Sequence, residues 1–77
     1  MALITDVTTT WSAPVVLVND EFWQVRKGNV FLTSSDSPTA DDGISILEGQ
    51  GLYIRAGRSV RYRKKAPTEV MISHEAV

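Results

Sequence analysis

The residues most able to do chemistry lie together in the second half of the chain. Six of the eight Lys and Arg fall between Arg55 and Lys65, and Tyr53 precedes them. An aromatic ring beside a row of arginines can stack on bases and contact phosphates, as in proteins that bind single-stranded nucleic acid. The same arginines can pair with carboxylates of a neighbouring subunit. They can also keep an exposed sheet edge soluble, because basic side chains discourage strand addition. The residue types leave these three roles open.

Other polar residues offer less. Asp36, Asp41 and Asp42 could supply oxygen ligands to calcium, but their spacing is not that of an EF-hand loop, so a solvated loop is the expectation. His74 stands between a serine and a glutamate. A catalytic triad needs convergence in space rather than adjacency in sequence, so His74 is expected at the surface. We therefore expect no enzymatic activity, no cofactor and no metal site.

The elements that must position the basic stretch are predicted to be short strands. Residues 51–65 alternate apolar and polar side chains on both sides of Ala56-Gly57-Arg58, which predicts a hairpin. On the expected outward face of this hairpin, four side chains form one row: Tyr53, Arg55, Arg61 and Arg63.

The first half repeats this pattern. The run Val15-Val16-Leu17-Val18 predicts a strand that is buried on both faces. A second hairpin is predicted around Lys27-Gly28-Asn29, with Phe22 and Phe31 on one face. Two aromatic rings on the outward face indicate that another copy of the chain covers it. The inward face is expected to carry Trp23, Val25, Val30 and Leu32 in either register of the hairpin, because side chains alternate with a period of two.

The whole chain predicts one all-β domain. Six or seven short strands recur about every eight to ten residues, with turn residues between them and no helical period, which is typical of a small antiparallel β-sandwich or barrel. The domain is expected to span residues 14–73. Residues 1–13 form an arm or a first short strand, on which Trp11 needs a docking site, and residues 74–77 form a tail.

Size and charge bear on partners. A chain of 77 residues without Cys has no disulfide, and its hydrophobic gain is close to its entropic cost, which favours a homo-oligomer. The net charge of −1 argues against nucleic acid as a partner. Acids predominate before residue 49 and bases after residue 54, which suits packing between copies or a mixed solvated surface. No secretory signal and no membrane span are expected, so the protein should be soluble and start in a cytoplasm.

Three stretches give a resemblance to a known group of proteins. They are Trp23-Gln-Val-Arg-Lys-Gly-Asn-Val-Phe-Leu-Thr, Leu47-Glu-Gly-Gln-Gly-Leu and Ile54-Arg-Ala-Gly-Arg-Ser-Val-Arg, with Ala40-Asp-Asp-Gly-Ile between the first two. Over residues 16–65 this order resembles small β-rich virion proteins of tailed bacteriophages. The resemblance implies a non-enzymatic part of the head surface, such as a head decoration or head-fibre base, or a neck or tail component. Such parts are commonly trimers or other rings. It implies no individual site residue.

These observations give a hypothesis and an alternative. The hypothesis is a bacteriophage structural protein that binds copies of itself, with a trimer the first expectation, and other virion proteins. It would be located in the virion, and in the host cytoplasm during assembly. The arginines would face carboxylates of a neighbour. The alternative is a small nucleic-acid-binding β-barrel that uses the basic hairpin over residues 55–65. The candidate interface residues are Trp11, Phe22, Phe31, Tyr53, Arg55, Arg58, Arg61 and Arg63.

Overall fold

The computed structural model describes residues 2–35, 37–39 and 43–77, and these residues form strands, turns and irregular segments only. The strands are β1 (Ala2–Ile4), β2 (Val15–Val16), β3 (Glu21–Lys27), β4 (Val30–Thr33), β5 (Ile44–Ile46), β6 (Gly51–Ile54), β7 (Ser59–Lys64) and β8 (Met71–Ala76). The predicted all-β fold is confirmed. No helix that could span a membrane is found in the described part of the chain.

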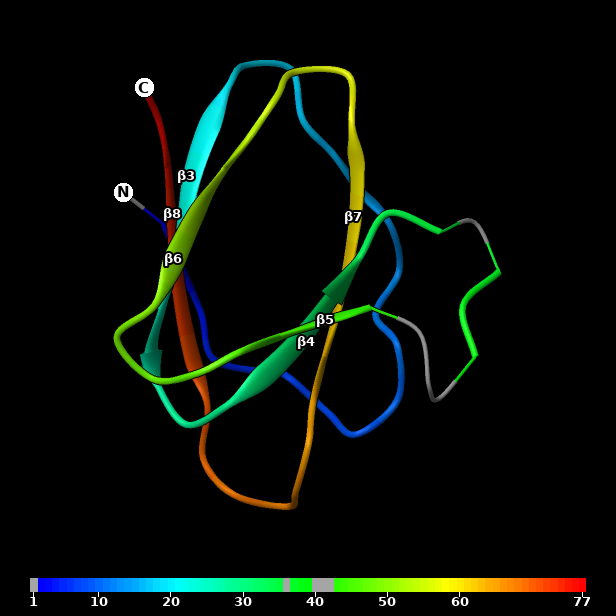
Figure 1. Cartoon of the computed structure of the whole chain (residues 1–77), viewed down its shortest axis with the longest axis vertical. Coiled ribbons are helices and arrows are strands. Elements are labelled where there is room, and N and C mark those ends of the chain that lie inside the picture. The colour runs from blue at the N-terminus through cyan, green and yellow to red at the C-terminus, as the bar shows by residue number, and fades with distance from the viewer. Residues whose placement is uncertain (1, 36, 40–42) are drawn as a thin grey trace.

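The strands form two antiparallel sheets that pack face to face. One sheet has the order β1-β8-β3-β6 and the other the order β2-β7-β4-β5. In Figure 1 the strands β3, β6 and β8 lie together on one side, and β4, β5 and β7 on the other. The C-terminus and β1 lie on the side of the first sheet, where β1 pairs with β8.

The core fills the space between the sheets. Its buried apolar side chains are Val7, Leu17, Trp23, Val25, Val30, Leu32, Ile46, Val60, Val70 and Ile72. The four side chains predicted to face inward from residues 21–33 are all among them, because alternation along a strand fixes which side chains meet the opposite layer. The inward face was therefore predicted correctly.

The hairpin predicted around Lys27-Gly28-Asn29 is wrong. The strands β3 and β4 belong to different sheets, and the chain crosses from one sheet to the other between them. The connection between β5 and β6 crosses back beside it, with the Val25 amide donating to the Gln50 carbonyl at 3.0 Å and the Gly49 amide donating to the Val25 carbonyl at 2.8 Å. Each of the two arms, β3–β4 and β5–β6, thus runs through both sheets, and together they form one long hairpin bent over the core.

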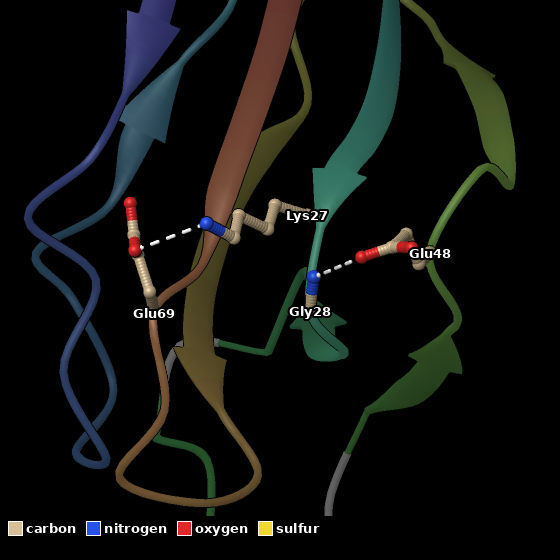
Figure 2. A network of polar contacts seen from close by, with 4 residues as sticks. All are labelled: Lys27, Gly28, Glu48 and Glu69. Carbon is tan, nitrogen blue, oxygen red and sulfur yellow. Dashed lines mark hydrogen bonds and ion pairs between the residues drawn. The ribbon is translucent and has the colours of Figure 1, made fainter.

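The corner of this bend is held by polar contacts around Gly28. Its φ angle is +74°, a conformation that favours glycine, and its amide donates to Glu48 Oε1 at 2.9 Å. Lys27 reaches to the other side and pairs with Glu69 at 3.1 Å, as Figure 2 shows. A Cβ at Gly28 would lie 2.7 Å from the Glu69 carbonyl oxygen. The corner therefore requires glycine for two reasons, its backbone angle and the space around it.

The hairpin predicted over residues 51–65 is also wrong. The turn itself exists, since the Arg58 amide donates to the Arg55 carbonyl at 3.3 Å and Gly57 has a φ of +87°. However, β6 lies in one sheet and β7 in the other. The turn pairs with another connection, because the Gly57 amide donates to the Leu17 carbonyl at 2.7 Å. These backbone contacts direct the chain across the end of the sandwich.

Two further segments differ from expectation. The run Val15-Val16-Leu17-Val18 was predicted to be buried on both faces, and this is wrong. Only residues 15 and 16 form a strand, at a sheet edge, and Val18 is 84% exposed. The last strand, β8, continues through Ala76 into the segment expected as a tail, because β3 pairs with it along this length.

Candidate functional site

Three of the candidate interface residues meet on the outer face of the second sheet. The Arg63 guanidinium carbon lies 4.4 Å from the ring centroid of Phe31, its register partner on β4, and 5.2 Å from the ring centroid of Trp11. The Trp11 indole N–H donates to the Thr39 carbonyl at 2.7 Å. The docking site expected for Trp11 is thus supplied by the chain itself, and the Arg63 side chain is held between two rings.

The segment after Trp11 is fastened to β7 by its neighbours. The Ser12 amide donates to the Tyr62 carbonyl at 2.9 Å, and Arg61 donates through Nη1 to the Ser12 carbonyl at 3.1 Å. Burial raises the pKa of Tyr62, the negative charge of Asp6 raises this pKa further, and a hydrogen bond with Ser12 works in the other direction. Arg61 and Arg63 are therefore both engaged within the fold.

A second pair of candidates lies on the outer face of the other sheet. Phe22 on β3 and Tyr53 on β6 are register partners, with ring centroids 4.9 Å apart at an interplanar angle of 57°. Phe22 is half-buried over Gly51, whereas Tyr53 is 73% exposed. The expectation that Phe22 and Phe31 share one face is wrong, because they lie on the outer faces of different sheets.

The predicted row of Tyr53, Arg55, Arg61 and Arg63 is not formed. Tyr53 faces outward from one sheet, while Arg61 and Arg63 face outward from the other, and Arg55 follows the end of β6. The stacking and phosphate contacts that a single-stranded nucleic acid requires would need these groups on one surface. The structure instead distributes the eight candidate residues over three places, of which the third holds Arg55 and Arg58 and is also reached by Tyr53.

This third place is a groove at the open edge of the sandwich, which we call the edge groove. It lies where β6 faces β4, β5 and the start of β7, and its volume is about 460 Å³. Its apolar and aromatic lining consists of Leu32, Ile44, Leu52, Tyr53, Ile54 and Val60. The groove is thus a continuation of the hydrophobic core that reaches solvent.

The polar lining of the edge groove is basic and hydroxylic. Arg55 and Arg58 line it from the turn after β6, Ser34 follows the end of β4, and Ser59 begins β7. The ion pairs between Lys27 and Glu69 and between His74 and Glu21 involve neither Arg55 nor Arg58. An apolar floor with two cations beside it suits a ligand that has apolar groups and a negative charge.

Sequence reasoning missed a polar cluster at one end of the core. His74 Nδ1 lies 2.9 Å from Glu21 Oε1, and the Trp23 indole N–H donates to the same oxygen at 3.1 Å. The His74 ring stacks on Trp23, with centroids 4.7 Å apart. The expectation of a surface histidine is therefore wrong, because the His74 side chain is only 22% exposed. The sequence did offer one signal for this cluster, because Glu21 and Trp23 are two residues apart and therefore lie on the same face of one strand.

No group of three or more His, Asp or Glu side chains is placed to hold a metal ion among the described residues. The three aspartates considered for calcium, Asp36, Asp41 and Asp42, lie outside the described residues. By its fold the chain is an antiparallel β-sandwich, and at one edge of the sandwich the edge groove is lined by Arg55 and Arg58. The chain matches no protein-family model, no curated protein and no solved structure.

Proposed function

We propose that this chain is a non-enzymatic structural protein of a tailed-bacteriophage particle and that it assembles with copies of itself. The observation that carries the self-assembly is the exposure of Tyr53. Its ring is 73% exposed on the outer face of an edge strand, directly beside Phe22. Aromatic rings are enriched at interfaces between proteins, because burying them removes a large apolar area from water. The resemblance over residues 16–65 supports the particle as the setting.

The surroundings of Tyr53 suit a contact between copies. One row across this sheet runs through Leu3, Ser73, Gln24 and Gly51, and the next runs through Glu75, Phe22 and Tyr53. Six of these seven side chains carry no charge, and Leu3 is half-exposed. Depletion of charge at the centre of an interface is typical of stable contacts between subunits. This outer face is therefore the surface through which we expect the copies to pack.

The size of the sandwich supports the same proposal. Its two sheets enclose a single small core, and the edge groove leaves part of that core open to solvent. Packing against further copies would add buried apolar area that the single chain does not reach. Neighbouring virion proteins are the other proposed partners, with the virion as the final location and the host cytoplasm as the place of assembly.

Sedimentation velocity over a range of protein concentrations tests the self-assembly. The wild-type chain should sediment as a multiple of its 8.5 kDa mass, and Tyr53→Ser should shift the distribution toward the monomer. Val16→Ser removes an exposed apolar side chain from an edge of the other sheet and should leave the distribution unchanged. A wild-type monomer at every concentration would overturn the self-assembly.

The genes that flank the coding sequence test the particle assignment. Capsid, portal or tail genes on either side would support it, and neighbours without any phage gene would contradict it. The nucleic-acid alternative predicts that single-stranded oligonucleotides bind at low salt and are released at high salt. We expect no such binding, since the residues required for it lie on different faces.

A further inference from the structure

We propose that the edge groove binds an extended segment of a partner protein, and that this segment carries an acidic side chain next to apolar ones. This goes beyond self-assembly, because the groove opens between the two sheets, whereas Phe22 lies on an outer face; Tyr53 packs on Phe22 and is also among the residues that line the groove. Three properties of the groove carry the inference: its apolar floor, its free strand edge and its two arginines.

The floor of the groove is made by core side chains. Leu32 and Val60 are buried at its base, while Leu52 and Ile54 are half-buried along one wall. Ile44 on the other wall is about half-exposed. A volume of about 460 Å³ is in the range of pockets that take small ligands, so it suits a few apolar side chains rather than a folded domain.

The wall formed by β6 also offers backbone groups. This strand is the last in its sheet and pairs only with β3, so its other edge faces no strand among the described residues. Natural edges are usually protected by proline, by charged side chains or by a bulge. Gly51-Leu52-Tyr53-Ile54 has no proline and no charge. An extended chain can therefore add to β6, with alternate side chains entering the groove beside Leu52 and Ile54.

The two arginines select the charge of that chain. Arg55 and Arg58 are exposed at the end of β6, and the hydrogen bond between their backbones keeps both at the groove. Guanidinium groups bind carboxylates through two parallel hydrogen bonds, and such charge complementarity selects between partners. A strand that adds antiparallel to β6 would begin near Arg55, so its acidic residue should lie close to its N-terminal end.

A labelled peptide tests the proposal. The probe is a blocked eight-residue peptide that begins with Asp-Glu and continues with alternating Val and Thr, and fluorescence anisotropy reports its binding to the full chain. We expect a Kd in the micromolar range that weakens with added salt. The double substitution Arg55→Glu with Arg58→Glu should weaken binding by about tenfold or more. Lys65→Glu makes the same kind of charge reversal away from the groove and should leave the affinity unchanged.

Further probes make the proposal falsifiable at each step. A peptide that begins with Lys-Lys should not bind, and a peptide with alternate N-methylated amides should lose most of its affinity because it cannot add as a strand. Equal affinity for either control peptide, or for the double variant, would overturn the proposal. So would chemical-shift changes centred on Trp11 and Phe31 instead of Leu52, Ile54 and Val60.

The two proposals fail separately. A chain that is monomeric in sedimentation but binds the acidic peptide overturns the self-assembly and upholds the groove. A chain that forms oligomers but binds no peptide at low salt overturns the groove alone. Near-ultraviolet circular dichroism of each variant confirms that its core is intact, and the exposed positions of Arg55, Arg58 and Lys65 favour that result.

Discussion

The guanidinium of Arg63 lies over the ring of Phe31, with 4.4 Å between the Arg63 Cζ atom and the ring centroid. Trp11 approaches the same guanidinium from the segment before β2, at 5.2 Å. A cation held between two aromatic faces is attracted by both. This contact joins the N-terminal segment to the outer face of the second sheet, so Arg63 contributes to the stability of the single chain.

The first prediction concerns this stack. Arg63→Ala should lower the free energy of unfolding by about 1–2 kcal/mol, since it removes the cation from both rings. Arg63→Lys should cost less, because a charge remains. Urea denaturation followed by tryptophan fluorescence measures both. Arg58→Ala, which removes an exposed arginine from the edge groove, should stay within about 0.5 kcal/mol of the wild type. Equal losses for Arg58→Ala and Arg63→Ala would contradict the role of the stack.

The second prediction separates backbone angle from space at glycine. Gly28 and Gly57 both have positive φ angles, +74° and +87°. A Cβ at Gly28 would meet the Glu69 carbonyl oxygen at 2.7 Å and Val70 Cγ2 at 2.8 Å, whereas one at Gly57 meets nothing within 4 Å. Gly57→Ala should therefore cost about 1–2 kcal/mol for the angle alone. In urea denaturation, Gly28→Ala should lower the free energy of unfolding by more than Gly57→Ala does. Equal losses would contradict a steric requirement for glycine at Gly28.

The third prediction concerns the acceptor shared by Trp23 and His74. Glu21→Met leaves the indole N–H and the imidazole without their carboxylate, and the side chains of Glu21 and His74 are only 15% and 22% exposed. We expect a loss of about 1–3 kcal/mol at neutral pH. Glu21→Gln keeps an acceptor oxygen and should lose less. Glu75→Gln, on an exposed position of β8, is the control. Thermal unfolding measures all three, and a neutral Glu21→Met would refute the role of this cluster.

The fourth prediction is a loss of stability in alkali. Burial and the charge of Asp6 raise the pKa of Tyr62 above its usual value near 10. The unfolded chain then ionises at a lower pH than the folded chain. The contribution that the neutral Tyr62 side chain makes to the free energy of unfolding is complete below pH 10, and it is lost as the pH rises through the pKa of the folded chain. Tyr62→Phe should therefore lose less stability than the wild type between pH 8 and pH 11. Parallel losses in the two proteins would contradict the assignment.

The period-two pattern predicted the inward face and could not predict the pairing. Trp23 and Val30 were both expected to face inward, and both are buried, although they lie in different sheets. Alternation distinguishes core from solvent within a strand. It does not say whether the next strand folds back beside the first or crosses to the opposite layer. A glycine such as Gly28 is compatible both with a hairpin turn and with a crossing to the other sheet. The tertiary contacts around this corner therefore determine which of the two forms.

The candidate site shows the same division. The aromatic and basic residues singled out from the sequence do lie at the surface or just below it, but a wrong pairing of β6 with β7 placed four of them in one row. The edge groove could not have been predicted, because its lining comes from β4, β5, β6 and β7, and these strands meet only when both sheets are formed. The stack of Trp11 on Arg63 joins residues too far apart in sequence for any local signal.

The crossing of the arms between layers has a consequence for how the chain folds. Among the strands that the described residues form, six of the seven connections between successive strands, all but the one from β4 to β5, change sheet. Neither layer is therefore a continuous piece of the polypeptide, and any fragment that contains one complete layer also carries strands of the other. Because these connections join the two sheets, forming one sheet also brings together the ends of most loops that the other sheet needs. We therefore expect folding to be cooperative, and to be slow, as is usual where residues distant in sequence pair. Such a molecule cannot lose one layer and keep the other.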